Sequence, residues 1–526
     1  MAMQRVESER ATTVSLRELM AEIGIREGMA VPETRIEAIT ADSRQAGPGA
    51  LFVAIAGQTV DGHAYVRAAV EQGCAAVLVG AGRCRGWKNV TVPCLEAEDT
   101  REALGRLAAG FYGRPAERMT MVGITGTNGK TTTTYLLEAM IRKAGGNPGV
   151  IGTVNYRYNQ VVKAAPFTTP DPVTLHRILA EMAEGGVTHV VMETSSHALE
   201  QRRLAGVRFD VALFTNLSRD HLDFHGTMEE YFASKQRLFR DHLKDAGRVV
   251  AICTADPDGN DWGRRVLDGL APEVASRAIA CGGGQEQVAV ERSAESIDGT
   301  CATLRTPVGE IALHSRLVGG FNLRNLLGAV GVGLALGIDA GTIGQGLNEA
   351  PAAPGRLEKV TTAASPDVFV DYAHTPDALE NVLTTLRQLT RGRLIVIFGC
   401  GGDRDRGKRP LMGKVAGELA DVVVLTSDNP RSEEPAAILA QIEEGVRQAG
   451  LPRMRLEAVI NRPGLRGYDV IVSRREAIRE VMRNSGRHDV VAICGKGHED
   501  YQIIGTRKTF FDDRLEAALS GASIGW

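Results

Sequence analysis

The sequence has 526 residues, more than one hydrophobic core supports, and the usual domain size predicts about three domains. A net charge of −3 without a basic tail argues against a nucleic-acid surface, and no apolar run approaches the ~20 residues needed to cross a bilayer. The first residues lack the apolar core of a signal peptide and the eight cysteines form no C-x-x-C pair, so we expect a cytoplasmic protein with reduced thiols and without a disulfide or zinc framework.

Proline and glycine punctuation at 112–119 and 348–358 predicts two joints, which divide the chain into 1–115, 116–353 and 354–526. In the first part, apolar runs at 50–57 and 75–80 predict strands on either side of a helical pattern at 63–73. The middle part repeats strand and helix, with apolar runs at 119–126, 188–196, 210–218 and 248–256. The last part has such runs at 393–402, 421–430 and 489–500. Buried strands that alternate with helices predict three α/β domains with parallel sheets covered on both faces.

Polar residues follow the predicted strands of the second and third parts. In open α/β sheets, ligands bind outside the carboxyl ends of the strands, and sites at domain interfaces are common. The alternative is that loops begin there and are simply polar, which does not explain the glycine and charge composition. The residues concerned are Gly126, Glu193, Asn216, Asp403, Asp428 and Gly495.

A glycine-rich stretch, "MTMVGITGTNGKTTTTYLLEAMIRKAGG", predicts a phosphate-binding loop between a strand and a helix. Gly126 and Gly129 let backbone N–H groups converge on phosphate, Lys130 would reach the β- and γ-phosphates, and the Thr131 hydroxyl would hold Mg²⁺. The strict pattern needs glycine where this chain has Ile124, so the match is to a variant loop. A chance glycine turn is the alternative. The predicted helix has one apolar face, formed by Leu136, Leu137, Met140 and Ile141.

Two further stretches, "VVMETSSHALEQRR" and "HLDFH", supply candidate metal ligands. A carboxylate at a strand end that faces a phosphate loop suits a second Mg²⁺ ligand, which favours Glu193. The side chains of His221, Asp223 and His225 could instead form a zinc site on an extended segment. No cysteine partner and no H-E-x-x-H helix supports zinc.

The stretch "DVVVLTSDNPRSEEP" places charged and amide side chains on a turn after an apolar strand. Pro430 fixes its own φ and biases Asn429 away from helix, so the chain must turn here. Arg431 presents a planar fork that suits a carboxylate, and Asp428 and Asn429 could meet an ammonium group. The alternative is a surface turn in which Arg431 pairs with a neighbouring glutamate, Glu433 or Glu434.

Taken together, the motifs resemble the Mur ligases of peptidoglycan synthesis, in particular those that add meso-diaminopimelate. The stretches that carry the resemblance are "GTNGKTT", "ETSSH", "NLSRDHLDFHGTMEEYFASK", "GGFNLRN", "DYAHTPDAL", "GCGGDRDRGKRP", "DNPRSEEP" and "GKGHEDYQ". The resemblance runs in order from about residue 42 to residue 513. It implies a smaller N-terminal α/β domain that binds the UDP-sugar, a central P-loop-type domain that binds ATP and a C-terminal Rossmann-like domain that binds the amino acid.

The resemblance also implies the reaction. ATP phosphorylates the terminal carboxylate of UDP-N-acetylmuramoyl-L-Ala-D-Glu, and the amine of meso-diaminopimelate then displaces phosphate from the acyl phosphate. Mg²⁺ is the implied cofactor, with Thr131, Glu193, His221 and Lys235 as its site. Lys235 matches a lysine that is carbamylated in the family, and Lys130, Lys235 and His221 match the catalytic positions. We expect a monomer.

By the same resemblance, the binding residues fall into three sets. ATP would meet Gly126, Thr127, Asn128, Gly129, Lys130, Thr131, Thr132, Asn322, Asn325, Asp371 and His374. The sugar dipeptide would meet Ser43, Gln58, Thr59, Val60, Thr168, Thr169, Ser195, Gln201 and Arg203. Diaminopimelate would meet Arg404, Asp428, Asn429, Pro430, Arg431, Gly495 and Glu499. Helix capping is the alternative for the two asparagines, and an ordinary buried histidine for His374.

Three rival functions remain open from the sequence. The first is a lysine-adding Mur ligase, although in such relatives the arginine of the D-N-P-R pattern is replaced. Folylpolyglutamate synthase resembles the chain around the phosphate loop, but it has no counterpart of the first domain or of "DNPRSEEP". An ATP-gated switch is the non-enzymatic rival, since a phosphate loop alone indicates binding and not chemistry.

Overall fold

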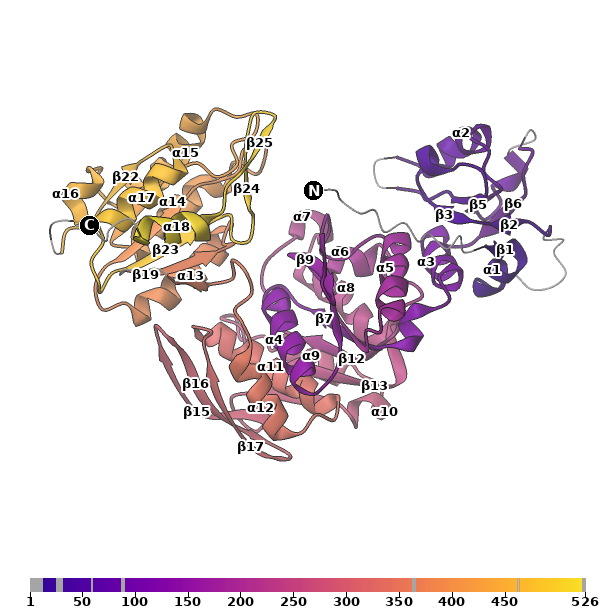
Figure 1. Ribbon diagram of the computed structural model, residues 1–526, viewed down its shortest axis with the longest axis horizontal. Coiled ribbons are helices and arrows are strands. Elements are labelled where there is room, and N and C mark those ends of the chain that lie inside the picture. Colours follow the sequence, from indigo (N-terminus) through magenta and orange to yellow (C-terminus); the bar gives the residue numbers. More distant parts are fainter. Residues whose placement is uncertain are drawn as a thin grey trace. The chain divides into compact units, whose positions relative to one another are not determined.

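The computed structural model describes residues 13–24, 32–57, 60–86, 90–361, 366–460, 462 and 464–522. The chain forms two compact units, one made of 1–288 and 328–343 and the other of 289–327 and 344–526. Strands and helices alternate through both units, so the predicted α/β class is confirmed (Figure 1). Among the described residues, no helix is both long and apolar enough to cross a membrane.

The first unit begins with a small parallel sheet of strand order β3-β4-β5-β6. Two apolar clusters cover its faces, one with α1 and α3 and the other with α2. The predicted strands at 50–57 and 75–80 are β4 and β5 of this sheet. The strands are β3 (Ala38–Thr40), β4 (Ala50–Val53), β5 (Ala76–Gly80) and β6 (Cys94–Ala97), with the separate pair β1 (Val14–Ser15) and β2 (Arg35–Ile36). The helices are α1 (Leu16–Glu22), α2 (Val66–Glu71) and α3 (Thr100–Phe111), with 3-10 turns η1 (Ser43–Gln45), η2 (Gly62–Tyr65) and η3 (Cys84–Gly86).

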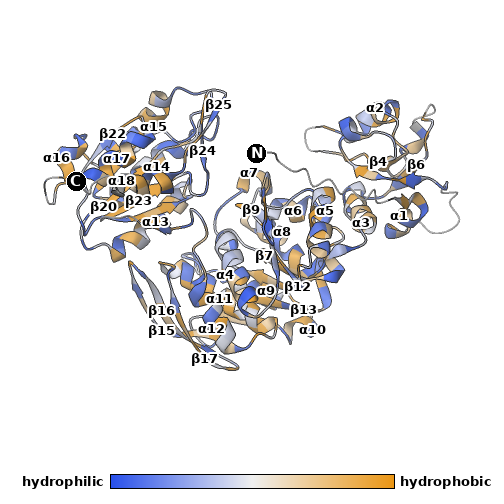
Figure 2. Ribbon diagram, in the orientation of Figure 1, coloured by the Kyte–Doolittle hydropathy of each residue, from blue (hydrophilic) through white to orange (hydrophobic). Residues whose placement is uncertain are grey.

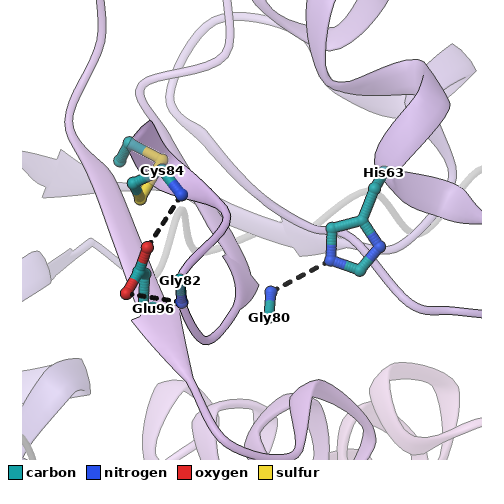
Figure 3. Close-up of a disulfide and its surroundings, with 6 residues drawn as sticks. His63, Gly80, Gly82, Cys84 and Glu96 are labelled. Carbon is teal, nitrogen blue, oxygen red and sulfur yellow. Dashed lines mark hydrogen bonds between the residues drawn. A yellow bond between two sulfur atoms is a disulfide. The ribbon is translucent and has the colours of Figure 1, made fainter. Parts of the chain in front are cut away.

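A disulfide joins Cys84 to Cys94 beside the edge strand of this sheet (Figure 3). The Glu96 carboxylate accepts hydrogen bonds from the N–H groups of Gly82 and Cys84, which ties the loop back to β6. The expectation of reduced thiols throughout is therefore wrong for this pair. The sequence carries no signal for it, because only the fold brings two cysteines ten residues apart to a Cα–Cα distance of 5.9 Å.

A larger sheet occupies the rest of the first unit, with strand order β10-β9-β8-β11-β7-β12-β13-β14. The strands β8, β11, β7, β12, β13 and β14 run parallel to one another, and β9 and β10 form an antiparallel edge next to β8 that the sequence did not predict. In β7, Gly123 lies opposite Met192 on one side and Ala212 on the other. The strands are β7 (Thr120–Thr125), β8 (Pro148–Ile151), β9 (Asn155–Tyr158), β10 (Val161–Ala164), β11 (His189–Glu193), β12 (Phe209–Phe214), β13 (Leu243–Ile252) and β14 (Ile279–Gly282).

Helices follow these strands as the alternating pattern predicts. The helix after β7 buries Leu136, Leu137, Met140 and Ile141, which confirms its predicted apolar face. The elements are η4 (Pro115–Arg118), α4 (Lys130–Lys143), α5 (Pro172–Glu184), α6 (Ser196–Glu200), α7 (Leu222–His225), α8 (Met228–Asp241), α9 (Trp262–Asp268) and α10 (Pro272–Ala275). Two later helices, α11 (Gly320–Ala335) and α12 (Ala340–Glu349), contain two of the three boundaries between the units.

The second unit contains an antiparallel meander and a six-stranded sheet of order β18-β19-β23-β20-β21-β22. The meander is β15 (Val288–Ser296), β16 (Gly299–Thr306) and β17 (Gly309–Ser315). In the six-stranded sheet, β18 (Glu358–Val360) is antiparallel, and the others are parallel: β19 (Asp367–Asp371), β20 (Leu394–Phe398), β21 (Val422–Leu425), β22 (Gly467–Val470) and β23 (Val490–Cys494).

Apolar residues fill both faces of this second sheet, and Figure 2 shows its central strands as hydrophobic. One face packs against α13 (Pro376–Leu389), α14 (Lys408–Leu419) and α15 (Pro435–Gln448). The other packs against α16 (Leu456–Ile460), α17 (Arg474–Asn484) and α18 (Asp513–Ala522). A hairpin of β24 (Tyr501–Ile504) and β25 (Arg507–Phe510) follows β23.

Candidate active site

The predicted phosphate loop lies between β7 and α4. Gly126 and Gly129 have φ values of 146° and 85°, which L-residues with side chains rarely adopt. A Cβ at Gly126 would lie 1.9 Å from the Thr215 hydroxyl, so the close approach also requires glycine. The Lys130 ammonium donates to the carbonyls of Gly126 and Thr127 at 2.7 and 2.9 Å. The loop thus folds over its own lysine at the N-terminus of α4, where backbone N–H groups favour anions.

The end of β12 holds this loop in place. The backbone N–H of Asn128 donates to Asn216 Oδ1 at 3.0 Å, and the Thr215 hydroxyl donates to the Asn128 carbonyl at 2.6 Å. Thr127 N donates to the Asn216 carbonyl at 3.0 Å. Asn216 was predicted only as a polar residue at a strand end, and its contacts show that it positions the loop. Thr132, also in the predicted ATP set, lies buried in the first turn of α4.

Glu193, at the end of β11, is the carboxylate next to the loop, and its side chain is buried. Thr131 Oγ1 lies 3.1 Å from Glu193 Oε2. Thr153 donates twice to the same carboxylate, from its N–H at 2.9 Å and from its hydroxyl at 3.0 Å. A hydroxyl and a carboxylate are hard oxygen donors, and Mg²⁺ is commonly held by one or two carboxylates together with substrate phosphates. Thr131 and Glu193 therefore fit the ion, and Thr153 is a residue that the sequence did not single out.

Lys235 and His221, the other two predicted metal-site residues, lie around Tyr231. Lys235 is fully buried; its ammonium donates to the Gly126 carbonyl at 2.9 Å and lies 4.4 Å from the centre of the Tyr231 ring. Burial lowers the pKa of Lys235 well below its ordinary value, and the charge of Lys130, on the same carbonyl, lowers it further. His221 has a φ of 54°, and its ring lies 6.1 Å from that of Tyr231. Burial lowers the pKa of His221, which favours the neutral imidazole that ligates metals.

The zinc alternative for "HLDFH" gains no geometric support. Within the described part of the chain, no group of three or more His, Cys, Asp or Glu side chains is arranged to hold a metal ion. The ring of His225 instead bonds the Ser196 hydroxyl at 3.0 Å and lies 5.0 Å from that of Tyr231.

Five residues predicted to hold the sugar dipeptide lie close to Glu193 in the first unit. Thr168 bonds the Thr153 hydroxyl at 3.1 Å, and Thr169 donates to the Glu193 carbonyl at 2.8 Å. Ser195 N donates to Thr169 Oγ1 at 3.1 Å, and the Arg203 guanidinium donates to the Thr169 carbonyl at 3.1 Å. Gln201 Oε1 accepts two N–H groups of Arg203, which fixes the plane of that guanidinium.

A cavity of about 490 Å³ adjoins these residues. Gln201 and Arg203 line it together with Arg101, Asp171 and residues that follow β3. A second cavity of about 450 Å³ is lined by Ser43 and Val60, both predicted to bind the UDP end. The other two residues of that prediction, Gln58 and Thr59, lie outside the described residues.

Four predicted ATP contacts belong to the second unit. Asn322 and Asn325 are buried on the first turns of α11, where Asn322 Nδ2 donates to the Val318 carbonyl and Asn325 Nδ2 to Asn322 Oδ1. The Asp371 carboxylate accepts two backbone N–H groups, from Leu357 at 2.6 Å and from Ala373 at 2.7 Å, so it holds the turn after β19. His374 Nδ1 bonds the Tyr372 carbonyl at 2.8 Å, and burial lowers its pKa.

The turn after β21 is held by backbone contacts with the loop after β20. A Cβ at Gly399 would lie 1.9 Å from the Thr426 carbonyl oxygen, and one at Gly402 would lie 1.8 Å from that of Pro430. Arg431 has a φ of 51°, and its Nη1 donates to the Gly402 carbonyl at 2.8 Å. The two loops therefore fit together without intervening side chains.

Arg431 does not make the surface pair that was the alternative reading of its sequence. The Glu433 carboxylate instead bonds Arg409 at 2.8 Å and Arg406 at 3.3 Å. Arg404 lies on the same loop as Gly402, with Nη1 donating to the Asp403 carbonyl at 3.1 Å. Two guanidinium groups thus lie at this turn, and part of the donor set of each remains for a ligand.

Two carboxylates also lie at this turn. Asp428 faces Gly495, where a Cβ would lie 2.5 Å from Asp428 Oδ2, and Gly495 has a φ of 114°. Asn429 Nδ2 donates to Glu499 Oε2 at 2.8 Å. Burial raises the pKa of Glu499, and nearby Asp428 raises it further. Contacts among the turn, the loop after β20 and the segment after β23 therefore bring together residues predicted to bind diaminopimelate, among them two guanidinium groups and two carboxylates.

Comparison with known proteins matches three parts of the chain to one family. The Mur ligase family catalytic domain matches residues 35–112, the Mur ligase middle domain matches residues 124–333, and the Mur ligase glutamate ligase domain matches residues 355–497. The chain belongs to the Mur ligase family.

Three similar proteins illustrate the range of the likeness. UDP-N-acetylmuramoyl-L-alanyl-D-glutamate--2,6-diaminopimelate ligase of Geobacter metallireducens is 47% identical over 489 residues, which are 92% of this chain and 94% of that protein. A solved structure of a ligase of that name has a TM-score of 0.69 at 31% identity and covers 97% of this chain and 99% of its own. Folylpolyglutamate synthase of Mycobacterium tuberculosis, complexed with ADP and AMPPCP, shares the fold, with a TM-score of 0.57 at 18% identity over 81% of this chain and 95% of its own.

Proposed function

We propose that this protein is an ATP-dependent amide ligase that adds meso-diaminopimelate to UDP-N-acetylmuramoyl-L-Ala-D-Glu in peptidoglycan precursor synthesis. The observation that carries the proposal is the turn after β21, where Arg431 lies three residues from Asp428 and where Asn429 contacts Glu499. A site with both signs of charge suits an amino acid whose far end carries a carboxylate and an ammonium group. The names of the relatives with high identity contain the same two substrates, UDP-N-acetylmuramoyl-L-alanyl-D-glutamate and 2,6-diaminopimelate.

The proposed reaction has two steps, phosphoryl transfer and then amide formation. A carboxylate oxygen of the D-Glu residue attacks the γ-phosphorus of ATP, ADP leaves, and an acyl phosphate forms. The diaminopimelate amine then attacks the acyl carbon, loses a proton, and expels inorganic phosphate as the amide forms. Phosphoryl transfer of this kind depends on positioning and charge neutralisation rather than on covalent chemistry by the protein.

Residues of the phosphate loop would supply that positioning. Lys130, held at the loop carbonyls, would turn to the β- and γ-phosphates when ATP enters. Thr131 and Glu193 would hold Mg²⁺, which when bound offsets the negative charge on the phosphates. Thr153 would orient the Glu193 carboxylate through its two hydrogen bonds. Thr168, which bonds Thr153, would connect this group to the acceptor substrate.

Carbamylation of Lys235 belongs to the proposal. Two ammonium groups on one buried carbonyl repel each other, and the lowered pKa of Lys235 increases the fraction of free amine, the form that reacts with CO₂. The carbamate is an anion, so it would attract Lys130 and could help to hold a second Mg²⁺ with His221. Domain limits at 115 and 353, a monomeric state and a cytoplasmic location complete the proposal.

Product formation tests the proposal against its rivals. The full chain is incubated with ATP, Mg²⁺ and UDP-N-acetylmuramoyl-dipeptide, together with diaminopimelate, lysine or glutamate, and ADP release and the amide product are measured. We expect ADP and amide in equal amounts with diaminopimelate and little product with lysine. Equal use of lysine would favour the lysine-adding alternative. Glutamate transfer to a folate, supplied as acceptor in a parallel incubation, would favour the synthase. Slow ATP hydrolysis without any amide would indicate a switch.

A further inference from the structure

Lys496 is a fully buried lysine that the proposed reaction does not use. It lies directly after β23, between Gly495 and Gly497, whose φ values are 114° and 53°. The two glycines let the backbone turn on both sides of the residue while its side chain remains inside the unit. A buried ammonium group is costly unless partners compensate for its lost hydration, so its contacts are informative.

Those contacts all lie in the amino-acid site. Lys496 Nζ donates to Asn429 Oδ1 at 3.2 Å and forms an ion pair with Glu499 Oε2 at 3.4 Å. It also lies 5.4 Å from the centre of the Tyr501 ring, within the range of a cation–π contact. One cation thus contacts two of the residues proposed to recognise diaminopimelate.

The contacts fix the orientation of the Asn429 amide. Asn429 Oδ1 accepts a hydrogen bond from Lys496 and a second from the Ile503 N–H at 2.9 Å. An amide oxygen has two lone pairs, so its accepting capacity is used. Asn429 Nδ2 in turn donates to Glu499. Asn429 can therefore offer a ligand only an N–H group and cannot accept a hydrogen bond from an ammonium group. That leaves the carboxylates of Asp428 and Glu499 as the acceptors.

Glu499 is the carboxylate that Lys496 and Asn429 hold. Its side chain is 17% exposed, so a ligand can reach it. The ionisable groups that face it are Lys496, Asp428, Tyr372 and Tyr501. Burial raises the Glu499 pKa, Lys496 lowers it and Asp428 raises it. An ammonium ligand requires the ionised form, which Lys496 favours.

We propose that Lys496 is a positioning residue of the amino-acid site: it holds the Glu499 carboxylate and the Asn429 amide in one orientation, so that Glu499 and Asp428 receive an ammonium group of the amino acid. The proposal rests on the proposed function and adds which residues of the site receive the ammonium group. Lys496 touches no substrate in it and acts through Glu499.

The test compares Lys496→Met with the unmodified full chain. Steady-state rates are measured against diaminopimelate at saturating ATP and UDP-N-acetylmuramoyl-dipeptide, from about pH 6 to about pH 9. At a pH below the Glu499 pKa, a rise of about one in that pKa lowers the ionised fraction about tenfold. We expect kcat/KM for diaminopimelate to fall about tenfold or more at the acid end and less at the alkaline end, because the Glu499 pKa rises without Lys496. The KM for ATP should not change. Lys496→Arg, which keeps the charge, should restore most of the loss.

A matched control lies on the other strand of the adjacent hairpin. Lys508 contacts the same Tyr501 ring at 3.8 Å but is exposed, and Lys508→Met should behave as the unmodified protein does. A second control is the double variant that carries both Lys496→Met and Glu499→Gln. If Lys496 acts through Glu499, the kcat/KM of the double variant for diaminopimelate should be no lower than that of Glu499→Gln alone.

Two results would overturn the inference. One is a Lys496→Met profile parallel to that of the unmodified protein at every pH, and the other is a further full loss in the Glu499→Gln background. Failure of the unmodified protein to use diaminopimelate would reject the proposed function instead, so the two failures are distinguishable.

Discussion

Replacement of Arg431 by alanine separates the hydrogen bond that its guanidinium makes from the ligand contact proposed for it. One N–H group holds the Gly402 carbonyl at 2.8 Å, and loss of a hydrogen bond of this kind costs about 1 kcal/mol whichever amino acid is bound. The remaining donors would bind the distal carboxylate of diaminopimelate, and loss of one partner of a buried charge pair costs about 2–5 kcal/mol. Lysine has no such carboxylate and should lose only the first contribution.

The expected result is therefore a larger fall in kcat/KM with diaminopimelate than with lysine. For Arg431→Ala, kcat/KM with lysine should fall about fivefold, and kcat/KM with diaminopimelate should fall by a further factor of about 30 to several thousand. ADP-coupled rates with both amino acids measure it, and calorimetric titration with ATP should give an unchanged affinity. Arg406→Ala is the control, because Arg406 is exposed on the neighbouring loop after β20 and pairs with Glu433. Retention of the preference for diaminopimelate in Arg431→Ala would refute the assignment of this turn.

Three other variants test separate parts of the structure. Lys235→Ala should lose activity that a short carboxylate such as formate partly restores in the amide-forming assay; unchanged turnover would reject the carbamate. Gly126→Ala should weaken ATP binding about tenfold or more by calorimetry, because the strained φ and a Cβ 1.9 Å from the Thr215 hydroxyl both oppose it; normal affinity would contradict the loop geometry. Asp513→Ala should cost about 3–5 kcal/mol of local stability, since it leaves the Arg474 guanidinium buried without its partner at 2.7 Å. Hydrogen exchange of α17 and α18 in the full chain measures that loss, and unchanged protection would contradict it.

Much of the fold could be predicted because its signals are local. Each apolar run in the second and third parts became a strand, and the glycines after β7 adopt the φ values that a phosphate loop requires. Ser473 caps the start of α17 in the same local way, since its hydroxyl accepts the Glu476 N–H. Such features depend on a few consecutive residues, so composition and spacing are enough to predict them.

The residues that sequence analysis missed depend on contacts between distant segments. Thr153 follows an ordinary strand, and only the fold brings it to Glu193, forty residues later. The sequence "GKGHED" shows Lys496 but not that its side chain is buried against Asn429. The disulfide requires the loop after β5 to return to β6. In each case a side chain gains its role from a partner that no local pattern identifies.

The glycines after β20 limit how selectivity can change in this protein. Gly399 and Gly402 lie against carbonyl oxygens of the neighbouring loop, so any larger residue there would separate two pieces of main chain. The shape of the proposed amino-acid site therefore cannot be changed by replacing these glycines. Evolution or design would have to change side chains such as Arg404 and Arg431, while the two paired loops stay constant.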